Sequence, residues 1–255
     1  MFRLGPIGVF DSGIGGVSVL SELIKIMPCE DYIYIADVKN APYGDKSAEE
    51  ILRCAEVNVK RLEDMKCKAV VIACNTATAV AAETLRREFK LDVFGIEPAI
   101  KPAAMERAGG NILVLTTALT AEQARFKELV KRYDGYMDSR FYCTSVQKMV
   151  TFIERGMGGS EEALEYLEGV FKAYKNIRFT SCVLGCTHFP MAKKAIEKAL
   201  GYEVEFFDGG IGTAKNVKRV LEEKELLTTS SQKGRIVLFG LGDKEIEQIK
   251  TTVKL

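Results

Sequence analysis

Short apolar runs alternate with stretches of helical periodicity along the whole chain, and this alternation limits the folds that the chain can adopt. An apolar run bounded by turn residues is typical of a strand buried in a parallel sheet. Two candidate capping boxes, Ser47 with Glu50 and Thr120 with Gln123, predict helix starts between the runs. Strands that alternate with helices form parallel sheets through right-handed crossovers. The sequence therefore predicts the α/β class, with mostly parallel sheets flanked by helices. The candidate strands are residues 7–10, 32–36, 69–73, 93–96, 112–115, 140–142, 179–184, 203–207 and 235–239.

The order of these elements repeats weakly, which predicts two related α/β domains. A polar turn follows the first strand of each half, and a cysteine later follows an apolar run in each half. Pro98 disfavours helix at Glu97 and marks one boundary. A second crossing is expected near Gly209. We predict a first domain of residues 1–97 plus 209–255 and a second of residues 98–208, with the active site in the interdomain cleft.

Composition excludes several classes of function. The net charge of the 255 residues is +1, which gives no electrostatic footprint for nucleic acid. No apolar run reaches the length of about 18 residues that a membrane span requires, so no membrane partner is expected. The seven cysteines have no disulfide-like spacing, which fits free thiols in a reducing cytoplasm. Cys182, Cys186 and His188 are one ligand short of a closed zinc site, and no metal is predicted.

Two cysteines stand in matched settings, one in each half. The run AVVIA precedes Cys74 and the run SCVLG precedes Cys186, and a threonine follows each cysteine within two residues. A thiol where a strand opens a helix lies at the helix N-terminus, which lowers its pKa from about 8.5 towards neutrality. Both thiols are therefore predicted to accept or donate protons near neutral pH. Buried cysteines are usually inert. The other five are interpreted as structural: Cys29, Cys54, Cys67, Cys143 and Cys182.

Two further titratable residues belong to the second half. His188 is the only histidine of the chain and follows Cys186 by two residues. A lone histidine is more often structural than catalytic, but beside a candidate acid/base thiol it could take a proton from that thiol or orient it. Glu154 ends an amphipathic stretch, residues 150–155, and its pattern alone is that of a solvated helix residue.

The segment DSGIGG, residues 11–16, follows the first candidate strand. Its pattern is that of a strand-to-helix turn, and it has neither the dinucleotide-binding glycine spacing nor a Walker lysine. Its backbone N–H groups could hold a carboxylate, and Asp11 could serve a nearby thiol as a proton partner. Small hydrogen-bonding residues lie at other strand ends, and a turn is expected at residues 42–44. These strand-end residues are Asn75, Thr76, Thr117 and Thr187.

Together these segments resemble glutamate racemases of the aspartate/glutamate racemase family. Each motif alone is weak, but their order over most of the chain is specific, and the second cysteine motif is the strongest. The matching motifs are DSGIGG (11–16), PYG (42–44), ACNTATA (73–79) and GCTHFP (185–190).

The resemblance implies a cofactor-independent enzyme that interconverts L- and D-glutamate and supplies D-glutamate for peptidoglycan synthesis. It also implies a cytoplasmic homodimer. One cysteine thiolate removes the α-proton and the other cysteine returns a proton to the opposite face. By this analogy Cys74 acts on D-glutamate and Cys186 on L-glutamate, with Asp11 assisting the first, and His188 with Glu154 assisting the second. The implied substrate-binding residues are Asp11, Ser12, Pro42, Tyr43, Gly44, Asn75, Thr76, Thr117, Thr120 and Thr187.

The chain departs from the family pattern at two places. Ala36 and Asn40 stand where the family often has Gly and Arg around Asp37. The second-half turn reads Thr116-Thr117 instead of Gly-Thr. Racemization of another amino acid such as aspartate, and a non-catalytic amino-acid-binding protein, are the alternatives. A thiol-redox protein is disfavoured because the chain has no Cys-x-x-Cys.

Overall fold

The computed structural model describes residues 5–106, 109–243 and 246. The chain divides into two compact units, of which unit 1 comprises Met1–Glu97 with Gly210–Leu255 and unit 2 comprises Pro98–Gly209. No helix in the part of the chain described is long and apolar enough to span a membrane.

Unit 1 is built on a five-stranded sheet in which every neighbouring pair of strands is parallel. The strand order β4-β3-β1-β2-β9 places the first strand in the middle. β1 and β3 are buried along their whole length, which explains why their sequences are almost continuously apolar. The strands are β1 (Ile7–Asp11), β2 (Tyr32–Ala36), β3 (Ala69–Ile72), β4 (Asp92–Gly95) and β9 (Ile236–Phe239).

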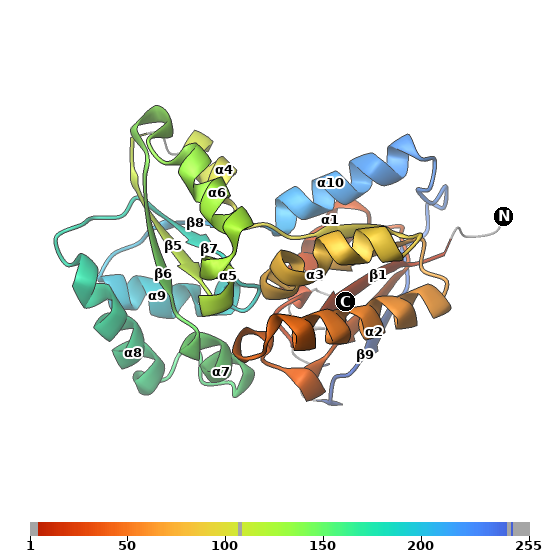
Figure 1. The fold of residues 1–255 in the computed structure, drawn as a ribbon, viewed down its shortest axis with the longest axis horizontal. Helices are drawn as coiled ribbons and strands as arrows, with labels where there is room; N and C mark the ends of the chain where they lie inside the picture. The colour runs from red at the N-terminus through yellow and green to blue at the C-terminus, as the bar shows by residue number, and fades with distance from the viewer. Residues whose placement is uncertain (1–4, 107–108, 244–245, 247–255) are drawn as a thin grey trace. The chain divides into compact units, whose positions relative to one another are not determined.

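Two pairs of helices pack in unit 1. α1 (Val17–Ile26) packs against α10 (Gly210–Glu223), and α2 (Ala48–Asp64) packs against α3 (Asn75–Glu88) (Figure 1). Successive strand residues point to opposite faces of a sheet. Accordingly, Ile7 of β1 shares a core with α1 and α10, whereas a side chain at the next position, Gly8, would meet Leu62 of α2. The two helix pairs therefore cover opposite faces of the sheet.

Unit 2 repeats this plan on a four-stranded, all-parallel sheet with the order β6-β5-β7-β8. Its strands are β5 (Asn111–Thr116), β6 (Arg140–Ser145), β7 (Ser181–Leu184) and β8 (Glu205–Asp208). One face shares a core with α4 and α6, and the other shares a core with α7, α8 and α9. The helices are α4 (Ile100–Glu106), α5 (Ala118–Glu122), α6 (Ala124–Tyr133), α7 (Lys148–Glu154), α8 (Glu161–Phe171) and α9 (Lys193–Leu200).

The predicted α/β class, with mostly parallel sheets flanked by helices, is confirmed. Each candidate strand corresponds to an observed strand, with ends that differ by a few residues. The capping box at Ser47 and Glu50 is present at the start of α2. The second capping box is wrong, because Thr117 is the N-cap of α5 and its side chain accepts from the backbone N–H of Thr120. The observed cap therefore lies three residues before the predicted one.

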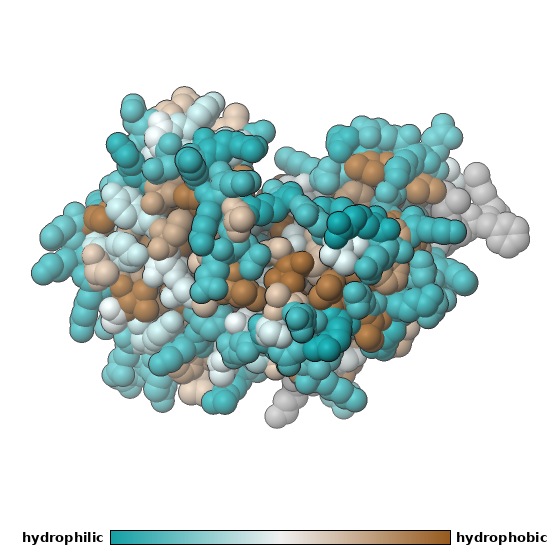
Figure 2. Space-filling model, in the orientation of Figure 1, coloured by the Kyte–Doolittle hydropathy of each residue, from teal (hydrophilic) through white to brown (hydrophobic). Residues whose placement is uncertain are grey.

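The helices are apolar on the side that faces a sheet and polar on the outside. In α2 the buried positions form one stripe, and Asn58 is the polar member of it. Figure 2 shows hydrophilic side chains over most of the outer surface of α2 and α10, with a few apolar side chains between them. A buried amide within an apolar stripe needs hydrogen-bond partners, and Asn58 finds them near the candidate active site.

A buried ion pair in unit 1 ties the segment after α10 to the start of β3. Lys68 Nζ lies 2.5 Å from Glu30 Oε2 and donates to the Leu226 carbonyl oxygen at 2.7 Å. Glu30 Oε1 accepts from the backbone N–H of Thr228 at 2.7 Å, and both charged side chains are 3% exposed. Breaking such a pair leaves an uncompensated buried charge and costs about 3–5 kcal/mol. We expect Lys68→Met to lower the free energy of unfolding by about that amount, measured by urea denaturation with far-UV circular dichroism.

Lys60→Met is the matched control for this prediction. Lys60 forms ion pairs with Glu63 and Asp64 on the surface of α2, and its side chain is 58% exposed. Exposed pairs contribute little to stability. The control should unfold like the wild type, and a Lys68→Met protein as stable as the control would contradict the prediction.

Candidate active site

Cys74 lies between β3 and α3, at the carboxyl edge of the unit 1 sheet. It is the N-cap residue of α3, and its Sγ accepts a hydrogen bond from the backbone N–H of Ala77 at 3.4 Å. Its side chain is 5% exposed, and Sγ lies 3.7 Å from Ser12 Oγ. The positive end of a helix favours a thiolate at this position. The predicted placement at a helix N-terminus is confirmed, and the catalytic role stays a prediction.

Asp11 ends the neighbouring strand of the same sheet. In the parallel register Phe10 pairs with Ile72, which brings the turn after β1 to the edge where Cys74 lies. Asp11 is fully buried, and its Oδ2 accepts from the backbone N–H of Gly13 at 3.1 Å. A Cβ at Gly16 would stand 2.5 Å from Asp11 Cβ, so only glycine fits there. The turn therefore holds the carboxylate in place through backbone contacts.

The other predicted residues of unit 1 also lie at this edge or pack against α3. Asn75 and Thr76 are the first two residues of α3, and both are buried. Asn75 Oδ1 has no hydrogen-bond partner in the described part of the chain. Leaving a buried acceptor unpaired costs about 1–3 kcal/mol, so this oxygen is suited to accept from a bound ligand. The turn at residues 42–44 contains the buried Tyr43 between Pro42 and Gly44, and it packs against α3.

Cys186 occupies the corresponding edge of the unit 2 sheet, after β7. Its side chain is 7% exposed, and Sγ lies 3.7 Å from Nδ1 of His188. The other ring nitrogen, Nε2, makes a short hydrogen bond to Oε1 of Glu154, the last residue of α7. A carboxylate at Nε2 favours the tautomer with its proton there, which leaves Nδ1 to accept from the thiol. The three residues thus form a thiol–imidazole–carboxylate chain.

Two expectations for this edge are corrected. Cys186 does not cap a helix, because a 3-10 turn, η5 (Phe189–Ala192), begins only after His188, and α9 follows it. The argument from a helix N-terminus therefore applies to Cys74 alone. The pattern of Glu154 indicated a solvated helix residue, but its side chain is 20% exposed and contacts the buried His188.

Three threonines complete the unit 2 group. β5 pairs with β7 so that Leu115 is opposite Leu184, which brings Thr117 to the edge where Cys186 lies. Thr117 Oγ1 lies 2.8 Å from Thr120 Oγ1, and both side chains are buried, as is that of Thr187. Thr116, which replaces the expected glycine, is also buried, and its methyl group would lie 2.8 Å from a Cβ at Gly185. The residue before Cys186 must therefore be glycine.

Comparison with known proteins agrees with this geometry. The family model described as Asp/Glu/Hydantoin racemase matches residues 16–215. The chain belongs to this racemase family. It is 42% identical to a glutamate racemase of Clostridium botulinum over 251 residues, which cover 98% of this chain and 96% of the relative. The resemblance stated from the motifs and the predicted enzyme class, an amino-acid racemase, are confirmed.

Solved structures of racemases share the fold. The glutamate racemase isoform RacE1 of Bacillus anthracis has a TM-score of 0.84 and 26% identity, covering 98% of this chain and 94% of that one. The glutamate racemase of Francisella tularensis, solved in complex with D-glutamate, has a TM-score of 0.81 and 25% identity, covering 100% of this chain and 95% of that one.

The remaining cysteines of this racemase differ in setting from the two candidates. Burial raises the pKa of the Cys67 thiol to about 12, and burial also raises the pKa of Cys182. Such thiols are poor proton acceptors at neutral pH. Among the residues that the structure describes, no group of three or more His, Cys, Asp or Glu side chains could hold a metal ion.

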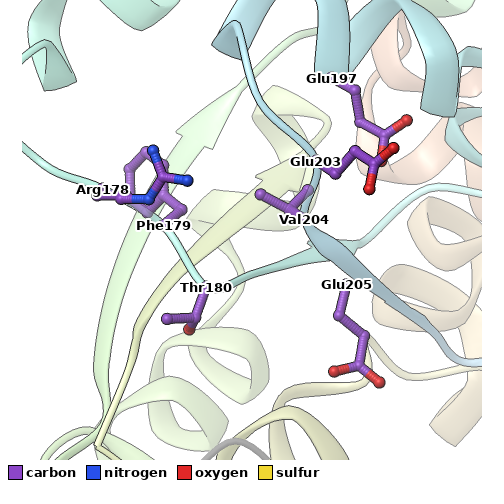
Figure 3. Close-up of a pocket in the computed structure, with 7 residues that line it drawn as sticks. All are labelled: Arg178, Phe179, Thr180, Glu197, Glu203, Val204 and Glu205. Carbon is purple, nitrogen blue, oxygen red and sulfur yellow. The ribbon is translucent and has the colours of Figure 1, made fainter.

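Unit 2 has a cavity of about 570 Å³, and Figure 3 shows the residues that line it. Apart from Glu197 of α9, its lining residues precede β7 or lead into β8, so the cavity lies at the amino edge of the sheet, whereas Cys186 follows the carboxyl end of β7. It is therefore not part of the candidate active site. The lining residues are Arg178, Phe179, Thr180, Glu197, Glu203, Val204 and Glu205.

The motifs did not identify a polar cluster around Asp37. Its carboxylate binds the side chains of Tyr43, Asn40 and Asn58. A signal for it exists in the sequence, because Asn58 interrupts the apolar stripe of α2. Its partner Asp37 is 21 residues away, beyond the reach of a local pattern.

Proposed function

We propose that this protein interconverts L- and D-glutamate by moving the α-proton between two thiols, without a cofactor. The observation that carries the proposal is a buried thiol at the carboxyl edge of each sheet, each with its own acid/base neighbour. For Cys74 that neighbour is Asp11 on the adjacent strand end, and for Cys186 it is His188. The glutamate racemase names of the relatives, and the D-glutamate complex of the Francisella protein, support the choice of substrate.

In the proposed reaction both thiols act on one bound substrate. The Cys74 thiolate removes the α-proton of D-glutamate, and the electron pair of the broken C–H bond stays on Cα and its carboxylate. The Cys186 thiol then gives its proton to the opposite face of Cα, which forms L-glutamate. Cys74 is left as a thiol and Cys186 as a thiolate, and that state is the one ready for L-glutamate. No electrons are gained or lost overall.

The α-proton of glutamate is far less acidic than a thiol, so the site must stabilise the charge that develops on the substrate. Buried hydroxyl, amide and backbone N–H groups suit this task because they are already oriented. We propose that Asn75 Oδ1 accepts from the substrate ammonium and that the threonine hydroxyls donate to its carboxylates. The proposed binding residues are Asp11, Ser12, Pro42, Tyr43, Gly44, Asn75, Thr76, Thr117, Thr120 and Thr187.

We further propose that the enzyme supplies D-glutamate for peptidoglycan synthesis and works as a homodimer in the cytoplasm. The support is the resemblance to glutamate racemases and the seven cysteines, which form no disulfide within the described residues. Sedimentation-velocity analysis tests the dimer, because a monomer at working concentrations would contradict it.

The test of the function is exchange of the substrate α-proton with solvent. In D₂O we expect the purified protein to replace the α-proton of either glutamate enantiomer with deuterium, as seen by proton NMR, and to bring the optical rotation of the solution to zero. Faster exchange of aspartate than of glutamate would move the substrate to aspartate. Calorimetric binding of glutamate with no exchange would indicate a binding protein.

Activity should be unchanged by EDTA and by removal of pyridoxal phosphate, and a loss that added metal restores would contradict the cofactor-independent mechanism.

A further inference from the structure

The side chain of Asp37, just after β2, is held by three neutral donors. Tyr43 Oη donates to Asp37 Oδ2 at 2.6 Å, and Asn58 Nδ2 donates to the same oxygen at 3.1 Å. Asn40 Nδ2 lies 2.9 Å from Oδ1 and 3.1 Å from Oδ2. In the described part of the chain no cation pairs with this carboxylate. Its geometry is therefore set by phenol and amide hydrogen bonds.

The same cluster is tied to the parts of unit 1 that surround Cys74. The backbone N–H of Asp37 donates to the carbonyl oxygen of Asp11 at 2.9 Å. Asn58 is buried on α2 and also donates to the Cys54 carbonyl oxygen at 2.9 Å. The turn that contains Tyr43 packs against α3, the helix capped by Cys74. Asp37 thus lies between the Asp11 turn and the Tyr43 turn.

The contacts fix the hydrogen-bonding role of Tyr43. The phenol is buried, and burial, followed by its hydrogen bond to Asp37, holds the pKa of Tyr43 far above its usual value. The charge of Asp37 and, to a smaller extent, the nearby Cys54 and Cys74 raise that pKa further. The hydroxyl proton of Tyr43 is committed to Asp37. The phenol therefore serves to anchor the turn and does not act as a proton donor to substrate.

We propose that Asp37 is a positioning residue, which holds the Tyr43 phenol and so fixes the substrate-binding turn at residues 42–44 against α3. The inference rests on the proposed function of this turn. Asn40 and Asn58 act through Asp37, because their amides orient its carboxylate. The Asn40 amide is neutral and donates to both oxygens of the Asp37 carboxylate, so the orientation is set without a cation.

The first test compares Asp37→Asn with Asp64→Asn, a matched removal of one carboxylate from the exposed end of α2. In Asp37→Asn one carboxylate oxygen becomes an amide N–H₂ group among donors, and the phenol loses its charged acceptor. We expect Asp37→Asn to raise KM for glutamate about tenfold with a smaller change in kcat, since the turn binds substrate in the ground state as well. The Asp64→Asn control should match the wild type. Wild-type KM in Asp37→Asn would overturn the proposal.

A double-variant comparison asks whether Asp37 acts through the phenol. If it does, Asp37→Asn should change KM by less than about twofold when Tyr43 is already phenylalanine, because the interaction has been removed. Full additivity of the Asp37→Asn and Tyr43→Phe effects would overturn the proposed route.

Should Asp37→Asn fail to fold, Asn40→Ala removes one support of the carboxylate from a half-buried position. A smaller rise in KM supports the proposal, and an unchanged KM overturns it.

A readout without activity separates this proposal from the proposed function. In protein labelled with ¹³C at tyrosine Cζ, the Tyr43 signal is assigned by its absence in Tyr43→Phe. Asp37→Asn replaces the charged acceptor of the phenol with a neutral one, so the ¹³Cζ chemical shift of Tyr43 should change in this variant. An unchanged Tyr43 signal would overturn the Asp37 proposal. A wild-type protein that does not racemize glutamate, yet shows this shift, would overturn the proposed function alone.

Discussion

Cys74→Ser and Cys186→Ser are each expected to lower racemization by a factor on the order of 10³ or more in both directions. A serine hydroxyl is far less acidic than a thiol, so it neither holds a negative charge at neutral pH nor gives up its proton as readily. Each direction uses both groups, one as base and one as acid. Loss of either thiol therefore stops inversion whichever enantiomer is supplied, as measured by circular dichroism.

The single variants also separate the two faces of the substrate. With Cys186 intact, Cys74→Ser should still exchange the α-proton of L-glutamate slowly with D₂O, without inverting the configuration at Cα. With Cys74 intact, Cys186→Ser should do the same for D-glutamate only. Proton NMR of each enantiomer measures this residual exchange. Exchange confined to the other enantiomer in either variant would reverse the assignment of the two thiols to D- and L-glutamate.

Two cysteines outside the candidate site serve as matched controls. Cys29 belongs to unit 1 and is partly exposed, and Cys143 lies on an exposed position of β6 in unit 2. Cys29→Ser and Cys143→Ser make the same chemical change without touching the proposed reaction, so both should keep wild-type turnover. Near-normal turnover of Cys74→Ser or Cys186→Ser in both directions would contradict the two-thiol mechanism.

The fold could be predicted because its signals are local. Strands buried on both faces are apolar runs, as in β1 and β3, and the helices between them are marked by periodicity and caps. The placement of Cys74 at a helix start also follows from adjacent residues. Two threonines three residues apart could cap α5, and the structure uses Thr117 instead of the predicted Thr120.

The partners of the site residues could not be derived from local patterns, because they depend on contacts that are distant in sequence, and only the resemblance grouped Glu154 with His188. Glu154 and His188 are 34 residues apart and meet only once α7 and the turn after β7 have packed on the unit 2 sheet. The separation of Asp37 and Asn58 is 21 residues, with β2 leading into one and α2 carrying the other. Periodicity reports which face of an element is buried, but not which polar group it meets there.

His188→Asn is expected to lower kcat/KM by a factor on the order of 10², because the imidazole Nδ1 faces the Cys186 thiol and can stabilise either of its protonation states. Glu154→Gln should have a smaller effect, about tenfold, since the carboxylate acts by orienting the ring and favouring its tautomer. The two enantiomers of glutamate have equal free energy, so kcat/KM must fall equally in both directions for each variant. Values of kcat/KM therefore cannot show which of the two thiols His188 assists, but isotope effects measured with each enantiomer can.

Slowing the step at Cys186 makes that step limit the overall rate. With α-deuterated L-glutamate, whose C–D bond Cys186 breaks, the isotope effect on kcat/KM should rise in His188→Asn. With α-deuterated D-glutamate it should fall, because bond breaking by Cys74 then precedes the slow step. Glu161→Gln, at an exposed position in the first turn of α8, is the control and should resemble the wild type. Isotope effects that change equally for both enantiomers would show that His188 does not act on the Cys186 side of the reaction.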